Sequence, residues 1–111
     1  MAKRSKATAP PPVAPLALPA ELTIYTVGEL RLQWLNWLTE GTLAPQARIE
    51  GNAVEQIDGA GLQMLLAMGR SLEAAGRSLH IEGASAVLRS GCEALGLSDW
   101  LRERSPEGAA A

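Results

Sequence analysis

Little in this sequence can support metal or nucleophilic chemistry. Its 111 residues include one cysteine, Cys92, and one histidine, His80. A lone cysteine cannot form an internal disulfide, which fits a reducing compartment. One histidine and one cysteine also leave little material for a tetrahedral metal site or a Ser-His-Asp triad. We therefore expect no metal, no other cofactor and no catalytic residue.

Long apolar runs and a basic face are also missing. No apolar run approaches the roughly 20 residues that a membrane span needs, so we expect no direct membrane insertion. The formal net charge is -2, and Lys3, Arg4 and Lys6 lie in the first few residues. The rest of the chain is therefore mildly acidic. Binding to a phosphate backbone needs a basic face, so we expect no nucleic-acid partner.

Proline marks the start of the chain. Because proline fixes φ and lacks an amide donor, residues 1–15 are predicted to be a disordered tail. A secretory signal is the alternative, with a basic start and an apolar part over residues 13–20, but prolines interrupt that part. Residues 103–111 also have the composition of a disordered tail. One domain over residues 16–102 remains. The early prolines are Pro10, Pro11, Pro12, Pro15 and Pro19.

The first elements of the domain follow from local patterns. Residues 22–25 are β-prone and predict a short strand. Thr26 and Glu29 have the spacing of a capping box, which predicts a helix from there to about Thr39, ended by Gly41. One apolar face of this helix carries two tryptophans, which favours core packing over a binding site. That face consists of Val27, Leu30, Trp34, Trp37 and Leu38.

The remaining pattern alternates strands with helices and predicts an α/β fold, a sheet with helices packed on it. Ser85 is a predicted helix cap, and Gly76 and Gly96 are predicted helix ends. Leu97, Trp100 and Leu101 are expected to fold back onto the core. The predicted elements are a strand over 47–50, a break at 51–52, an extended run over 54–57, a helix over 59–75, a strand over 79–83 and a helix over 86–95.

The turn from Asp58 to Gly61, where the extended run enters a helix, is the candidate functional site. Asp58 is a favoured N-cap, because its carboxylate can accept an amide hydrogen from the first helical turn. Gly59 and Gly61 leave the turn bare, so that another molecule can approach closely. The local sequence alone is equally consistent with a helix start that only needs capping.

From about Leu22 to Leu101 the sequence resembles a STAS domain, the module shared by sulphate transporters and anti-sigma factor antagonists. The matching residues are the segment from Val54 to Leu62, the apolar helix that follows, residues 79–81, and the segment from Ser85 to Leu97. The resemblance implies a four- to five-stranded mixed sheet packed with three to four helices. It also implies a non-enzymatic role, docking onto a regulatory partner at the start of the Gly61 helix.

The sequence departs from the family beside Asp58. In the sigma-factor antagonists the next residue is a serine or threonine that the partner kinase phosphorylates. Here that position is Gly59, followed by Ala60, and the nearest later hydroxyl in the helix is Ser71. The resemblance therefore implies that this chain has the family's docking surface but lacks its phosphorylated residue. The predicted partner-binding residues are Asp58, Gly59, Ala60, Gly61, Leu62, Gln63, Met64 and Ala67.

Three functions follow from these residues. The first is a cytoplasmic bacterial signalling module that binds a kinase-like, anti-sigma or chemotaxis-type protein. The second is a STAS accessory subunit of a phospholipid-transporting ABC complex that binds the complex's ATPase. The third is an enzyme built on Cys92 or His80, which we reject. Cys92 is expected near the core, where thiols are inert, and His80 is expected on the outer face of its strand.

Overall fold

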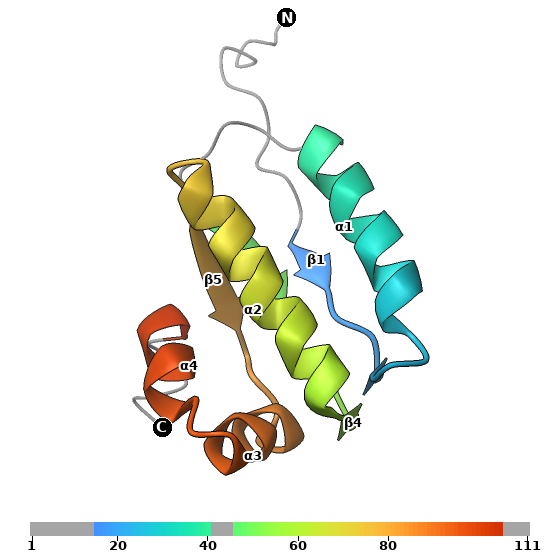
Figure 1. Cartoon of the computed structure of the whole chain (residues 1–111), viewed down its shortest axis with the longest axis vertical. Coiled ribbons are helices and arrows are strands. Elements are labelled where there is room, and N and C mark those ends of the chain that lie inside the picture. The colour runs from blue at the N-terminus through green and yellow to red at the C-terminus, as the bar shows by residue number, and fades with distance from the viewer. Residues whose placement is uncertain (1–14, 41–45, 106–111) are drawn as a thin grey trace, which may run out of the picture.

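A computed structural model describes residues 15–40 and 46–105. This part of the chain contains short parallel strands and four helices, which confirms the predicted α/β class (Figure 1). Residues 1–14 of the predicted tail over 1–15, and residues 106–111 of the predicted tail over 103–111, lie outside the described residues. The elements are β1 (Leu16–Ala17), β2 (Glu21–Leu22), α1 (Val27–Glu40), β3 (Gln46–Glu50), β4 (Gln56–Ile57), α2 (Gly59–Ala74), β5 (Ser78–Glu82), α3 (Ala86–Ala94) and α4 (Ser98–Arg104).

The strands form two small sheets, and the strands within each sheet run in the same direction. One sheet has the order β1-β3-β5 and the other pairs β2 with β4. Every strand pair within the described residues is parallel, whereas the expected sheet was mixed. The reason is the connections between paired strands: α1 lies between β1 and β3 and between β2 and β4 along the chain, and α2 lies between β3 and β5. Such a helical crossover returns the chain to start a parallel strand.

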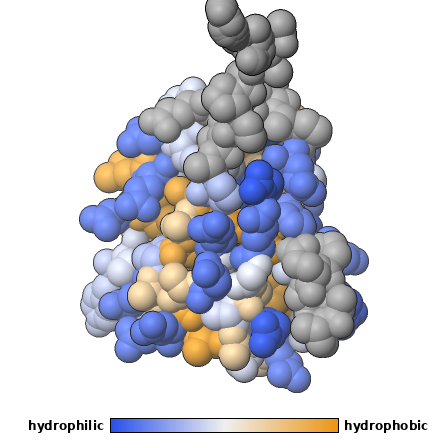
Figure 2. Space-filling model, turned by 180° about the vertical axis from the view of Figure 1, so that it is seen from behind, coloured by the Kyte–Doolittle hydropathy of each residue, from blue (hydrophilic) through white to orange (hydrophobic). Residues whose placement is uncertain are grey.

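The β1-β3-β5 sheet has one face covered by helices and one polar face. In β3, Ala47 and Ile49 are buried, and the register places Ile49 beside Ile81 of β5. Figure 1 shows α2 lying across the front of the sheet with α1 beside it, and α3 and α4 near the end of the chain. Seen from behind, hydrophilic side chains dominate, with smaller hydrophobic patches between them (Figure 2). On the polar face Arg48 of β3 pairs with Glu82 of β5 at 2.7 Å.

The core lies between the sheet and the helices. Trp34 is buried and stacks on the partly buried Trp37, with ring centroids 5.6 Å apart, which confirms the expected packing role. The buried hydrophobic residues are Leu18, Leu22, Leu30, Trp34, Ala47, Ile49, Val54, Leu62, Leu65, Met68, Leu72, Leu79, Ile81, Ala84, Leu88, Cys92 and Leu101.

The predicted helix signals near the C-terminus are confirmed. The Ser85 hydroxyl accepts the amide of Leu88 at 3.0 Å and caps α3. Gly76 and Gly96 follow α2 and α3 with φ of 75° and 74°, a left-handed conformation that suits glycine. Beyond them, α4 extends to Arg104, two residues past the predicted domain boundary at 102.

Arg104 explains this longer end. Its guanidinium lies 4.7 Å from the ring centroid of Trp100 and 2.8 Å from the Glu73 carboxylate of α2. Trp100 in turn lies beside Gly69, where an added Cβ would be 3.6 Å from the indole. These contacts attach α4 to α2.

The predicted strand over residues 22–25 is wrong beyond Leu22, where β2 ends. Residues 23–26 form a turn that two threonines shape. The Thr26 hydroxyl donates to the Glu21 carbonyl at 2.7 Å and accepts the Thr23 amide at 3.0 Å. The Thr26 amide bonds to the Thr23 carbonyl at 2.9 Å. Thr26 is thus committed to the turn and not to the predicted capping box with Glu29.

Candidate functional site: a groove between the starts of α1 and α2

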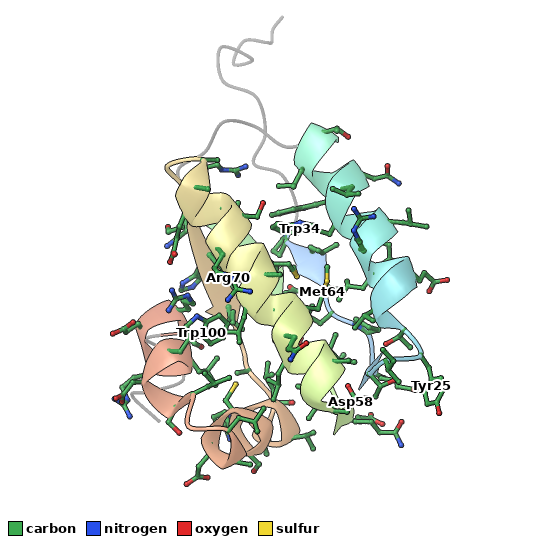
Figure 3. The ribbon with its side chains drawn as sticks, in the orientation of Figure 1. Tyr25, Trp34, Asp58, Met64, Arg70 and Trp100 are labelled. Carbon is green, nitrogen blue, oxygen red and sulfur yellow. The ribbon has the colours of Figure 1, made fainter. Side chains whose placement is uncertain are left out.

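The Asp58 carboxylate lies at the junction of two segments that are distant in sequence. One oxygen, Oδ1, accepts the Gly61 amide at 2.9 Å, which confirms Asp58 as the N-cap of α2. The other oxygen, Oδ2, accepts the Ile24 amide at 3.0 Å. Asp58 therefore bonds to the start of α2 and also to the turn of residues 23–26 that precedes α1. Figure 3 shows Asp58 and Tyr25 at the same end of the molecule.

These two amides favour the charged form of the side chain. The hydrogen bonds from the Ile24 amide and then the Gly61 amide lower the pKa of Asp58 below its ordinary value. The carboxylate is therefore ionised at neutral pH, and its charge lies beside the positive end of the α2 dipole, where a negative charge is stabilising.

Gly59 and Gly61 have different surroundings although both lie in the first turn of α2. A Cβ added to Gly61 would overlap the carbonyl oxygen of Leu22 and lie 2.8 Å from the carbonyl carbon. A Cβ added to Gly59 would meet nothing within 4 Å. Gly61 thus lets α2 pack against the end of β2. Gly59 is exposed and leaves open space over the helix start.

A groove of about 350 Å³ lies beside this corner, between the first turns of the two helices. Its α1 side begins in the exposed turn and continues along the helix, and its α2 side begins at Ala60. Met64 points into the space between α1 and α2 (Figure 3). Arg31 is the one charged residue in its lining. We call this feature the α1/α2 groove; it is lined by Ile24, Val27, Gly28, Arg31, Ala60, Gln63 and Met64.

Two large exposed side chains stand on the turn at one end of the groove. Ile24 is 60% exposed and Tyr25 is 89% exposed. Sequence reasoning missed both because it placed them in a strand. The signal that could have found them is the pair of flanking threonines, since threonine hydroxyls bond to nearby backbone and favour turns over strands. A tyrosine this exposed beside an apolar groove has the character of an interface anchor.

The predicted partner-binding residues divide into two groups. Gly61 and Leu62 are buried, so they support the corner from inside and cannot face a partner, contrary to expectation. The other group is at least partly accessible: Asp58, Gly59, Ala60, Gln63, Met64 and Ala67. Met64 is only partly exposed, because it packs against the core as well as lining the groove.

The two candidate reactive residues lie away from the groove. Cys92 is fully buried in α3, and this burial raises the pKa of its thiol. His80 is partly exposed on the polar face of β5, between the buried Leu79 and Ile81, as predicted. In the described part of the chain, no group of three or more His, Cys, Asp and Glu residues could hold a metal ion. Within the same residues, no helix is both long and apolar enough for a membrane span.

These features define a small α/β domain with an apolar groove beside a capped helix start. A family model described as "Mlab, STAS domain" matches residues 7–103, which is most of the chain. The chain belongs to this STAS family, and membership indicates a protein-interaction or signalling module. The match begins inside the predicted N-terminal tail. Searches of curated proteins and of solved structures found no significant match.

Proposed function

We propose that this protein is a non-enzymatic signalling module that docks onto a regulatory protein through the α1/α2 groove and the Asp58 corner. The partner is of the kinase-like, anti-sigma or chemotaxis type, and the setting is the bacterial cytoplasm. The observation that carries the proposal is the position of Ile24 and Tyr25. Ile24 is exposed and lines the apolar groove together with Met64, beside the start of α2, and its chain neighbour Tyr25 is exposed next to that lining.

The lining of the groove suits a protein segment better than a small polar substrate. Ile24, Val27 and Met64 offer apolar contacts, and methionine adapts its shape to different partners. Glycine at position 28 leaves the α1 side open, since a Cβ there would meet nothing within 4 Å. Helix-in-groove binding uses surfaces of this kind, with apolar anchors spaced along one face of the incoming helix.

Docking at this surface does not depend on phosphorylation at the antagonist position. Gly59 and Ala60 have no hydroxyl group, so no phosphate can be attached at either residue. A phosphate there would add about -1.5 to -2 charges beside the groove. The module therefore binds constitutively, or the partner's own state controls the association.

A second candidate is an accessory subunit of a phospholipid-transporting ABC complex that binds the complex's ATPase. Two observations favour it: the matching family model is described as an Mlab STAS domain, and the phosphoacceptor is missing at Gly59. The same groove serves both candidates. They differ in the protein that copurifies, an ATPase with a membrane component in one case and a soluble regulator in the other.

Affinity purification with mass spectrometry tests the docking surface when two charge variants are compared with the parent. Gly59→Asp places a negative charge beside the groove, and its Cβ would meet nothing within 4 Å. Ser71→Asp makes the same charge change on the exposed side of the same helix, roughly 18 Å along its axis. We expect Gly59→Asp to lose the partner and Ser71→Asp to keep it. Equal recovery with both variants would remove the groove as the interface.

A further inference from the structure

We propose that Asp58 is a positioning residue: its carboxylate holds the turn of residues 23–26 against α2 and so sets the shape of the α1/α2 groove for the partner. This inference rests on the proposed function for its biological meaning, although its structural part can be tested without any partner. The observation behind it is that the two carboxylate oxygens bond to the two elements that border the groove, Oδ2 to the Ile24 amide of the turn and Oδ1 to the Gly61 amide of α2.

The turn has an internal shape that does not require Asp58. The Thr26 hydroxyl bonds to Glu21 and Thr23, and the Thr23 hydroxyl accepts the Tyr25 amide at 3.2 Å. None of these bonds reaches α2. Among the hydrogen bonds of the described residues, the one from Ile24 to Asp58 is the one that ties this turn to the helix. Losing it would release the turn from α2 without unravelling the turn itself.

The start of α2 has anchors other than the Asp58 side chain. The Asp58 backbone amide donates to the Leu22 carbonyl at 3.3 Å. In addition, β2 pairs with β4, with Leu22 opposite Ile57. Gly61 also packs directly against Leu22. Removal of the carboxylate therefore leaves α2 in place, and the turn that carries Ile24 is the part that moves.

Asparagine at position 58 should keep one of the two hydrogen bonds and lose the other. It is about as good an N-cap as aspartate, so its oxygen keeps the Gly61 amide. Its other terminal atom is an NH₂ group, which donates and cannot accept the Ile24 amide. Asp58→Asn thus keeps the cap and frees the turn, whereas Asp58→Ala loses both bonds. Asp99→Asn is the matched control, because Asp99 is an exposed aspartate in the first turn of α4.

Amide hydrogen exchange of the full chain, read residue by residue by NMR, measures both bonds. In Asp58→Asn we expect exchange of the Ile24 amide to rise about tenfold while the Gly61 amide keeps its parental rate. In Asp58→Ala both amides exchange faster, and in Asp99→Asn neither changes. The proposal is overturned if the Ile24 amide keeps its parental rate in Asp58→Asn. It is equally overturned if the Gly61 amide opens there as much as in Asp58→Ala.

Partner affinity tests the functional half. With the partner recovered by the parent protein, Asp58→Asn is expected to weaken binding about tenfold and Asp99→Asn to leave it unchanged. Unchanged affinity in Asp58→Asn, with the Ile24 amide freed, overturns the positioning role. That outcome leaves the docking surface standing, because the docking surface is judged by Gly59→Asp. The two hypotheses therefore fail under different results.

Discussion

At Gly61, the addition of a single methyl group is expected to destabilise the fold strongly. Gly61→Ala adds one methyl group, and that group would overlap the carbonyl oxygen of Leu22. Comfortable contacts between heavy atoms lie at about 3.5–4.0 Å. The two nearest atoms in the way are backbone atoms of Leu22 in β2, so no side-chain rotation relieves the overlap. Either α2 must move away from β2, or β2 must move away from its partner β4.

The size of the effect follows from overpacking. Forcing extra methyl groups into a packed site costs about 1–3 kcal/mol, and a backbone obstacle belongs at the upper end. The gain in helix propensity from Gly to Ala is at most about 1 kcal/mol. We therefore expect Gly61→Ala to lower the free energy of unfolding by about 2 kcal/mol. For a domain of this size, that corresponds to a Tm lower by roughly 8–16 °C.

Gly59→Ala is the matched control, because it makes the same chemical change two residues earlier in the same helical turn. An added Cβ there meets nothing within 4 Å, so only the propensity gain remains and Tm should stay the same or rise slightly. Thermal and urea unfolding followed by circular dichroism measure both variants. If Gly61→Ala melts within a degree or two of Gly59→Ala, then the close packing of α2 on Leu22 is not a structural requirement.

Three further predictions concern other parts of the molecule. Cys92→Ser buries a hydroxyl in place of a thiol and should lower the free energy of unfolding by about 1–3 kcal/mol. A thiol reagent should label native Cys92 only as the protein unfolds, and rapid labelling would contradict its burial. Arg104→Gln loses an ion pair and an aromatic contact and should lower the free energy of unfolding in urea by about 1 kcal/mol. Arg102→Gln, which loses only an exposed ion pair, should change it by less than about 0.5 kcal/mol, and equal effects would refute a special role for Arg104. Because its folded-state pKa is lowered, Asp58 stabilises the fold above its ordinary pKa of 3.8 and loses this contribution as pH falls through the folded value. The stability gap between the parent and Asp58→Ala should therefore be constant near neutral pH and shrink below about pH 4, and a constant gap down to pH 3 would exclude the carboxylate charge as its source.

Local sequence rules were sufficient where the deciding interaction is local. The Ser85 cap on α3 and the glycine end of α2 at Gly76 involve partners within four residues, so composition and spacing predict them. Asp58 as the cap of α2 is of the same kind, because its partner Gly61 is three residues away.

The site itself depends on contacts between distant residues, which explains what the sequence did not reveal. Ile24 and Tyr25 have strand propensity, yet the Ile24 amide bonds to Asp58, 34 residues later. The resemblance assigns both Leu62 and Gln63 to the docking surface, but Leu62 is buried with Leu65 and Leu72 on the apolar face of α2, which the 3.6-residue period separates from the accessible Gln63. The sequence therefore located the corner, and the three-dimensional structure added the α1 side of the groove.

Site-specific photocrosslinking in cells with the full chain tests docking at the α1/α2 groove most directly. A photoreactive phenylalanine analogue replaces Tyr25 in one protein and the exposed Ser71 in another. Docking at the α1/α2 groove predicts that a partner protein crosslinks from position 25, that adding Gly59→Asp abolishes this product, and that position 71 yields none. Crosslinking of the partner from position 71 and not from position 25 would contradict docking at the α1/α2 groove.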